Sequence, residues 1–243
     1  IKVQGAIHPD TLISALNLAA FYDTLGRYSD AEPMYKKVLR LSQKNLGEKH
    51  PFTLSVFRSI AALYASQGLY SKSLSMNEKA LQISIEILGE KHPETLSSLD
   101  NLGVSYMNSG RYSDAALLLE KGLRMNEEIL GEKHPNTLNS LNNLATLYYD
   151  IGRSEDAIQM TKKELRLKRE VFGEKHPKTL LALNNLAYIY YAQGHYSDAE
   201  PLFKKGMRLR QEVLGEMHPD TLITLENLAN LYQSQEQYAE AEI

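Results

Sequence analysis

Six of the seven histidines stand before a proline, and each His-Pro pair follows the last after 42 residues. Imidazole binds metals and transfers protons, so these are the first chemistries to consider. Zinc needs ligands about 2 Å from one centre, whereas one histidine per unit places successive rings at least about 8–10 Å apart. The spacing therefore indicates a structural role at the entry to a helix, restricted by the following proline. The pairs begin at His8, His50, His92, His134, His176 and His218.

Other reactive groups are missing or form no catalytic pattern. The chain has no cysteine, which excludes disulfides, zinc–thiolate sites and thiol chemistry. No nucleophile elbow, phosphate-binding loop or glycine-rich dinucleotide turn occurs. Carboxylates are abundant, but those of the Gly-Glu-Lys segments recur with the unit and belong to linkers. We therefore expect no enzyme, no metal and no cofactor.

Composition narrows the class of partner. The net charge of −3 is too small to favour nucleic acid or an anionic membrane. No apolar run approaches the roughly 18 residues of a membrane span, and no signal peptide opens the chain. The absence of cysteine fits a reducing compartment, so we expect a cytoplasmic protein. Both ends fall inside a repeated unit, which we interpret as a fragment of a longer protein.

Each 42-residue unit predicts two helices. In the fifth unit, apolar residues from Leu180 to Tyr190 recur mostly at steps of three and four, as on the buried face of an amphipathic helix. Gly194 ends this helix, because glycine accepts a left-handed conformation. Ser197 and Glu200 have the spacing of a capping box, so we expect the second helix to begin after Ser197.

The period alone also suits HEAT and armadillo units of about 40–47 residues. The residues are more specific: Leu183-x2-Leu186-Ala187-x2-Tyr190 followed by Ala199-x3-Phe203 resembles the tetratricopeptide repeat (TPR) signature, with leucine in place of tryptophan. The segments Leu-Asn-Asn-Leu-Ala, Ala-Glu-Pro and Gly-x-x-His-Pro are similar to the 42-residue units of kinesin light chain and related bacterial arrays. This resemblance covers almost the whole chain.

The resemblance implies an all-α fold, an α-solenoid in which antiparallel helix pairs stack into a right-handed superhelix. One hairpin cannot bury both of its apolar faces, so stability should accumulate repeat by repeat. We expect a single array over residues 1–243. Its units are 9–50, 51–92, 93–134, 135–176, 177–218 and the partial unit 219–243.

In TPR proteins the first helices of successive units line a concave groove. The resemblance therefore implies groove positions two and one before the second signature leucine, and two, five and six after it. From these positions we select twelve candidate binding residues. They are Asn17, Asp100, Asn101, Asn142, Asn143, Tyr149, Asn184, Asn185, Tyr188, Tyr191, Asn227 and Asn230.

Asparagine and tyrosine suit peptide recognition for different reasons. A side-chain amide both donates and accepts, so it can pair with the backbone of an extended peptide whatever its sequence. Tyr149, Tyr188 and Tyr191 stand outside the repeated tyrosine positions and offer an apolar anchor with a polar tip. The structural alternative is that the asparagines cap or bridge neighbouring helices, above all Asn143 and Asn185 beside the signature leucine.

Charge distinguishes this groove from that of kinesin light chains, which are associated with acidic, tryptophan-containing peptides. The groove positions carry Asp23, Asp100, Asp150 and Glu226 against Arg58 alone. An acidic peptide would be repelled, so we expect a neutral or basic one.

These observations favour a non-catalytic scaffold that binds a peptide or partner segment in its groove. The alternative is a structural spacer or sensor array in a larger multidomain protein. A variant of it is end-to-end self-association, because the partial sixth unit should leave Leu225, Leu228 and Leu231 poorly covered.

Overall fold

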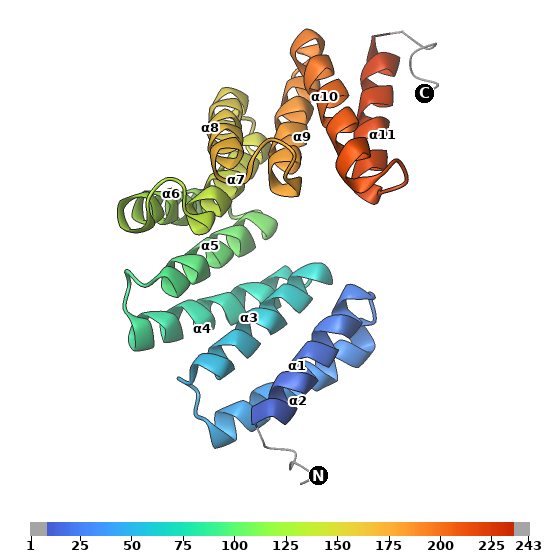
Figure 1. Cartoon of the computed structure of the whole chain (residues 1–243). Helices are drawn as coiled ribbons and strands as arrows, with labels where there is room; N and C mark the ends of the chain where they lie inside the picture. The colour runs from blue at the N-terminus through green and yellow to red at the C-terminus, as the bar shows by residue number, and fades with distance from the viewer. Residues whose placement is uncertain (1–8, 236–243) are drawn as a thin grey trace. The chain divides into compact units, whose positions relative to one another are not determined.

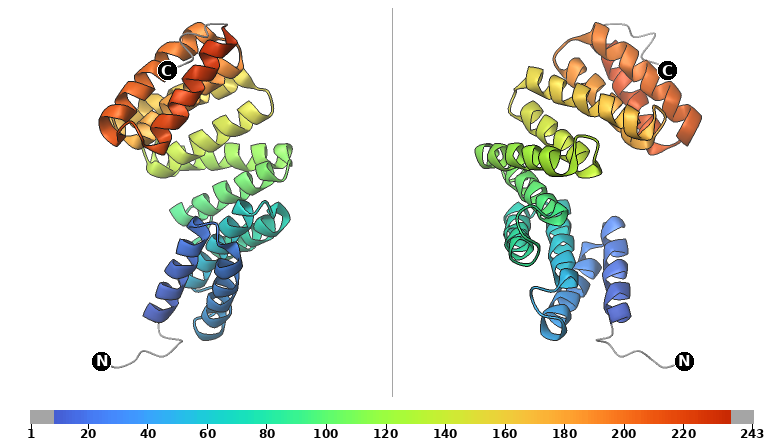
Figure 2. Two further views of the ribbon diagram at one scale, coloured as in Figure 1. Left: turned by 90° about the vertical axis from the view of Figure 1, so that its right-hand side faces the viewer. Right: turned by 60° about the vertical axis from the view of Figure 1, so that its left-hand side comes forward.

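A computed structural model describes residues 9–235, which form eleven α-helices and no strand (Figure 1). First and second helices alternate along the chain, and the two helices of each pair run antiparallel (Figure 2). The all-α class of stacked helix pairs is therefore confirmed. The helices are α1 (Pro9–Thr24), α2 (Tyr28–Asn45), α3 (Pro51–Ser66), α4 (Tyr70–Leu88), α5 (Pro93–Asn108), α6 (Tyr112–Leu130), α7 (Pro135–Asp150), α8 (Ser154–Phe172), α9 (Pro177–Ala192), α10 (Tyr196–Leu214) and α11 (Pro219–Ser234).

The His-Pro pairs start the first helices, as predicted. Proline occupies the first helical position, and the preceding histidine is the N-cap with extended backbone. Its Nδ1 accepts a hydrogen bond from the backbone N–H two residues later, at 3.1–3.2 Å, which satisfies one free donor of the helix end. The histidines that do this are His50, His92, His134, His176 and His218, while His8 lies outside the described residues.

The linker before each first helix is held by a threonine. Thr179 is buried, and its hydroxyl donates to the Gly173 carbonyl at 2.8 Å. Gly173 has φ 87°, a left-handed conformation in which a side chain would be strained. Thr137 makes the same bond to Gly131 at 2.8 Å. The threonine–glycine hydrogen bond and the left-handed glycine therefore fix the conformation of the Gly-Glu-Lys-His-Pro-x-Thr linker. A linker held in this way requires a fixed number of residues.

The predicted capping box of the second helix is wrong. Helix α10 begins at Tyr196, before Ser197, and its N-cap is His195, which makes no side-chain capping bond. The cause is the tight turn at Gly194, φ 74°. The His195 N–H closes the previous helix on the Tyr190 carbonyl, while the His195 carbonyl already accepts from Ala199. One residue thus ends one helix and starts the next, which leaves no place for a serine cap.

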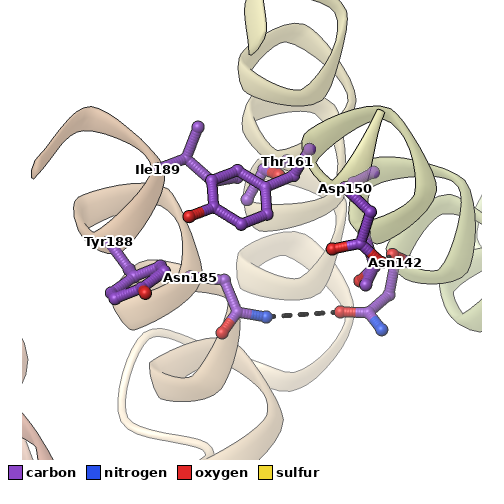
Figure 3. Close-up of a pocket in the computed structure, with 9 residues that line it drawn as sticks. Asn142, Asp150, Thr161, Asn185, Tyr188 and Ile189 are labelled. Carbon is purple, nitrogen blue, oxygen red and sulfur yellow. Dashed lines mark hydrogen bonds between the residues drawn. The ribbon is translucent and has the colours of Figure 1, made fainter. Parts of the chain in front are cut away.

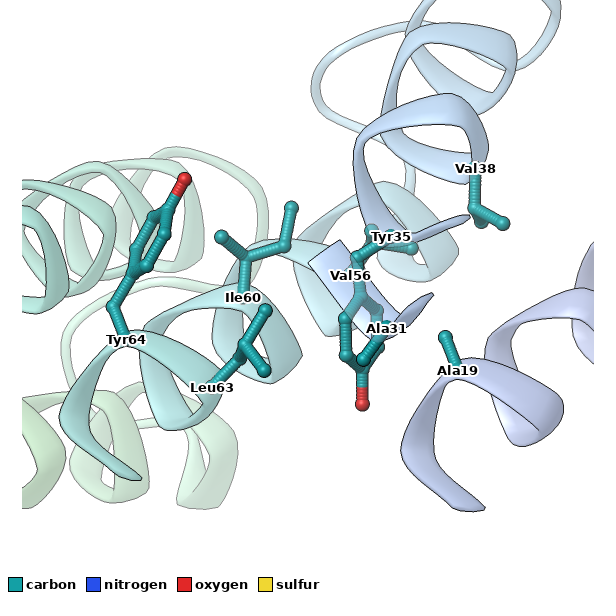
Figure 4. Packing of buried hydrophobic residues seen from close by; sticks show 8 residues of the cluster. All are labelled: Ala19, Ala31, Tyr35, Val38, Val56, Ile60, Leu63 and Tyr64. Carbon is teal, nitrogen blue, oxygen red and sulfur yellow. The ribbon is translucent and has the colours of Figure 1, made fainter. Parts of the chain in front are cut away.

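The helices divide into two compact units, Ile1–Met125 and Asn126–Ile243, with the boundary inside α6. Within each unit a helix packs mainly on its neighbours in sequence. In the first unit α1, α2 and α3 share a core (Figure 4), and in the second α9, α10 and α11 share one with Phe203 at its centre. The first cluster contains Ala19, Ala31, Tyr35, Val38, Val56, Ile60, Leu63 and Tyr64.

A buried polar residue recurs late in each second helix, and its partners differ between repeats. Ser84 meets Ser98 at 3.0 Å, and Asn126 donates to Ser140 at 2.9 Å. Each partner belongs to the next first helix, so these contacts join one repeat to the next. The equivalent positions are Ser42, Ser84, Asn126, Lys168 and Arg210, all at most 5% exposed.

Two of these positions carry a buried charge. Arg210 donates to the Thr224 hydroxyl at 2.5 Å and to the Asp220 carbonyl at 2.6 Å. Lys168 pairs instead with Glu164 of its own helix. Burial raises the pKa of Glu164, although the Lys168 charge acts in the opposite direction.

The expectation of poorly covered leucines in the sixth unit is wrong for Leu228 and Leu231, while Leu225 is half-buried. Leu228 and Leu231 are 1% and 0% exposed, because α9 and α10 cover them. Exposed apolar residues lie on α1, where Leu18 and Phe21 are 44% and 56% exposed, and elsewhere on α11, where Leu222 and Ile223 are 43% and 49% exposed.

Candidate functional site

In the second unit a hollow of about 250 Å³ lies between the first helices α7 and α9, and Thr161 of α8 contributes to its wall. Asn185 and Tyr188 of α9 lie on one side of it, and Asn142 and Asp150 of α7 on the other (Figure 3). The lining is formed by Asn142, Ala145, Thr146, Tyr149, Asp150, Thr161, Asn185, Tyr188 and Ile189.

An amide pair spans the hollow. The Asn185 Nδ2 donates to the Asn142 Oδ1 at 3.3 Å, and both residues are half-buried. This single bond leaves hydrogen-bonding capacity on both side chains, because an amide offers two donors and an acceptor with two lone pairs. The bridging role considered for Asn185 is therefore present, and it leaves donors and an acceptor for a ligand.

Tyrosines form a cluster at the hollow. The rings of Tyr149 and Tyr188 are tilted, with centroids 5.9 Å apart, and Tyr191 lies 6.3 Å beyond Tyr188. Burial and the Tyr188 hydroxyl raise the pKa of Tyr149. Tyr188 is 42% exposed, whereas the Tyr191 hydroxyl pairs with Ser234 of α11 at 3.1 Å. Tyr149 and Tyr188 are thus the aromatic rings that line the hollow, and Tyr191 contributes to packing.

The hollow is acidic. Asp150 is its one charged residue, and no lysine or arginine lines it. Burial raises the pKa of Asp150, because removing water disfavours the carboxylate. No ion pair reaches Asp150 from the described part of the chain, so its negative charge at neutral pH is not compensated there.

The first unit has a hollow of about 150 Å³ at the same repeat positions, between α3 and α5. A shift of 84 residues, two repeats, places Ala65 where Tyr149 lies and Val104 where Tyr188 lies. Arg58 corresponds to Asn142. The two hollows share a backbone frame but differ in chemistry: the first has small apolar residues and a cation, the second aromatic rings and an acid.

Arg58 does not project freely into the groove, as its sequence position implies. Its guanidinium donates to the Ser98 hydroxyl and the Glu94 carbonyl, both at 2.8 Å, and forms an ion pair with the Glu94 carboxylate at 3.3 Å. The side chain therefore bridges α3 and α5.

The structure distributes the twelve predicted residues over four environments: the second hollow, the first hollow, the remaining surface and the packing between helices. Asn142, Tyr149, Asn185 and Tyr188 line the second hollow, and Asn101 lines the first. The remaining surface positions are exposed or half-buried and join neither: Asn17, Asn143, Tyr191, Asn227 and Asn230.

Asp100 and Asn184 require a correction, because they are only 5% and 9% exposed and lie in the packing between helices. A Cβ on Gly122 of α6 would come within 2.5 Å of the Asp100 Oδ1, which shows that this glycine makes room for the carboxyl. Asn184 occupies the same repeat position as Asp100 and is also buried. Neither belongs to the candidate site.

Thr161 was missed because it lies on a second helix. It is 1% exposed, and its hydroxyl donates to the Ala157 carbonyl at 2.8 Å. Asn77 has the same position in the first hollow and donates to Ser105 at 2.6 Å. A polar residue on the apolar face of a second helix is the sequence signal that could have found both.

Neither metal binding nor membrane insertion finds support in residues 9–235. Histidines and carboxylates do not gather there in groups of three that could hold a metal ion. None of these helices combines the length and apolarity that crossing a bilayer requires.

Models of the tetratricopeptide repeat match residues 10–84, 56–128, 118–170, 179–220 and 221–243. The chain belongs to the tetratricopeptide repeat family. Nearly identical TPR-like repeats of a Podosopora anserina kinesin-light-chain-type protein align with a TM-score of 0.71 and 24% identity, over 87% of this chain and 99% of theirs. The predicted kinesin-light-chain-like TPR type is confirmed. A comparison with curated protein sequences finds no match.

Two further solved structures share this fold. BtubC (BKLC) from P. vanneervenii aligns with a TM-score of 0.71 and 22% identity, over 95% of this chain and 87% of that one. NprR, solved in complex with its cognate peptide NprX, aligns with a TM-score of 0.63 and 18% identity, over 95% of this chain and 64% of NprR. At these identities the alignments show the fold alone.

Proposed function

We propose that this chain is a non-catalytic, cytoplasmic scaffold that holds an extended peptide or partner segment along α7 and α9. The observation that carries the proposal is the Asn142–Asn185 amide pair beside the exposed ring of Tyr188. It places backbone-type hydrogen-bonding groups and an apolar anchor in one hollow.

The chemistry suits a peptide better than a rigid small molecule. Amides pair with peptide N–H and C=O groups without reading the side chain, while tyrosine adds contact area at a low cost in conformational entropy. An extended peptide advances about 3.3 Å per residue, so one or two of its residues would span the hollow. NprR, a protein of the same fold, was solved with its cognate peptide, which supports a peptide as the class of ligand.

The test compares wild type with the double variant Asn142→Ala/Asn185→Ala. Fluorescein-labelled random decapeptide pools would be titrated by fluorescence polarisation, and bound sequences recovered from the pools. Losing two hydrogen bonds of about 0.5–1.5 kcal/mol each should weaken binding about tenfold. Asn101→Ala, at the equivalent of Asn185 in the first hollow, is the matched control and should bind like wild type. Equal affinity of double variant and wild type would overturn the proposal.

A second function, end-to-end self-association, is favoured by the exposed face of α1. Leu18 and Phe21 are 44% and 56% exposed, whereas Ile60 and Leu63, one repeat later, are 2% and 0% exposed. In α3 the corresponding residues pack on the preceding second helix, and in the 243-residue chain a second helix of another copy could pack on α1 in the same way. Light scattering should then show association that rises with concentration and disappears in Phe21→Asp. A constant monomer mass would exclude it.

A further inference from the structure

We infer that the hollow between α7 and α9 receives the side chain of an arginine in the bound peptide, held by Asp150 and the rings of Tyr149 and Tyr188. This inference rests on the proposed peptide-binding function and names the chemistry that the peptide must present. It is argued from the composition of the hollow, from a similar arrangement elsewhere in the chain, and from the corresponding hollow of the first unit.

The residues that line the hollow supply the groups that bind a cation. Asp150 supplies a negative charge that no ion pair within residues 9–235 compensates. Tyr149 and Tyr188 supply aromatic faces with centroids 5.9 Å apart, and a cation within about 6 Å of such a face is attracted by the ring quadrupole. Asp150 is exposed on the wall of the hollow, so its carboxylate is open to a cation that enters there.

The same three groups already occur together in the turn between α7 and α8. The Arg153 guanidinium carbon lies 4.1 Å from the ring centroid of Tyr148, and its Nε is 2.7 Å from the Asp156 carboxylate. Arginine, tyrosine and aspartate thus form one stacked and ion-paired group on this fold. The hollow contains the tyrosines and the aspartate but no arginine.

Geometry favours arginine over lysine. A guanidinium is planar, stacks on an aromatic ring and still directs N–H groups to a carboxylate, whereas an ammonium is a compact, strongly hydrated charge. The spare Asn185 Oδ1 is a further acceptor for these N–H groups.

The first unit provides an internal control. At the corresponding positions Ala65 and Val104 replace the two tyrosines, Ser66 replaces Asp150, and Arg58 lies on the lining. That hollow lacks both the rings and the acid and carries a cation, so it should not bind arginine.

The experiment uses N-acetyl-arginine amide and its neutral isostere N-acetyl-citrulline amide, titrated into the ¹⁵N-labelled chain and followed by NMR. We expect the arginine probe to shift the side-chain amide signals of Asn142 and Asn185, with a dissociation constant of about 1 mM, and to leave Asn101 unmoved. Citrulline should bind about tenfold more weakly, because it loses the ion pair and the cation–π contact. Asp150→Asn should reduce arginine binding toward the citrulline level, and Tyr188→Leu should weaken it while leaving the carboxylate in place.

Equal shifts by the two probes, or arginine binding unchanged by Asp150→Asn, would overturn the inference. A second titration separates it from the proposed function, using decapeptide pools that contain either arginine or citrulline. If both pools bind through Asn142 and Asn185 with equal affinity, the peptide-binding function is supported and the arginine site is refuted. If the arginine probe binds as expected but no pool binds, the arginine site stands and the peptide scaffold falls.

Discussion

The Asn185 side chain on α9 donates to the Asn142 side chain on α7 at 3.3 Å, one repeat and one residue apart. Protein N–H···O bonds lie mostly between 2.7 and 3.2 Å, so this bond is slightly longer than usual. A weak pair of this kind can exchange its mutual bond for bonds to a ligand at small cost. The bond joins two successive repeats, so the site is formed by a pair of repeats and is absent from any single one.

Arginine binding in this hollow should depend on pH through Asp150. Burial raises the pKa of Asp150 above the ordinary value of 3.8, and a cation binds the ionised form. Affinity for N-acetyl-arginine amide should therefore be full at neutral pH and fall as the pH is lowered through that raised pKa. The raised pKa of Tyr149 keeps its hydroxyl protonated in this range. NMR titrations from pH 7 to pH 4 would test this, and Asp150→Asn should show a flat profile.

The histidine caps should contribute measurable stability. His50 is exposed and its Nδ1 accepts from the Phe52 N–H at 3.1 Å, so His50→Ala should lower the free energy of unfolding by about 1 kcal/mol. His50→Asn should retain most of it, because an amide oxygen can accept the same bond. His195 is an N-cap without a side-chain bond, so His195→Ala is the matched control and should cost much less. Urea unfolding of the three variants would measure these free energies. An equal loss of unfolding free energy in His50→Ala and His195→Ala would refute a capping role.

Removing one partner of the buried Glu164–Lys168 ion pair should reduce stability more than replacing both partners. Glu164→Ala would leave the Lys168 charge without its partner at 5% exposure, and such losses cost about 3–5 kcal/mol. The double variant Glu164→Ala/Lys168→Ser copies Ala80 and Ser84, the same positions in the second repeat, and should recover most of that stability. Thermal unfolding of the single and double variants would measure the coupling. A double variant as unstable as the single one would show that the pair is not the cause.

Two helical glycines should respond oppositely to alanine. A Cβ on Gly206 would meet nothing nearer than Leu183 Cδ2 at 3.7 Å, so Gly206→Ala should stabilise α10 by about 0.5–1 kcal/mol. A Cβ on Gly103 would lie 2.7 Å from the Leu119 Cδ2, and Leu119 is fully buried. Gly103→Ala should therefore destabilise by about 1–3 kcal/mol through overpacking. Melting temperatures that rise for Gly206→Ala and fall for Gly103→Ala would agree with this, and a shared sign would contradict it.

The fold could be predicted from the sequence because each unit repeats the same residues that start and end its helices. Proline fixes where a first helix begins, and glycine with a left-handed backbone fixes where helices end. The Ser197 capping box failed because the spacing is real but the turn at Gly194 starts the helix two residues earlier. Local patterns thus placed the helices but did not settle which residue caps them.

The site was harder to predict because burial depends on the facing helix. Asn142 and Asn184 share one repeat position, yet Asn142 lines a hollow and Asn184 is buried. Both positions hold asparagine, so the difference in burial comes from the side chains that pack around each of them and not from the local sequence. Arg58 was misjudged for a similar reason, since its partner Ser98 lies 40 residues away.

The changing polar residue between repeats restricts which neighbour each repeat can accept. Arg210 needs the hydroxyl of Thr224, and one repeat earlier that place is held by Ala182. Stacked out of order, Arg210 would bury a guanidinium against a methyl group, a mismatch that strongly disfavours the wrong arrangement. Near-identical repeats are prone to exchange segments between molecules. The buried polar residues late in the second helices should disfavour such domain swapping.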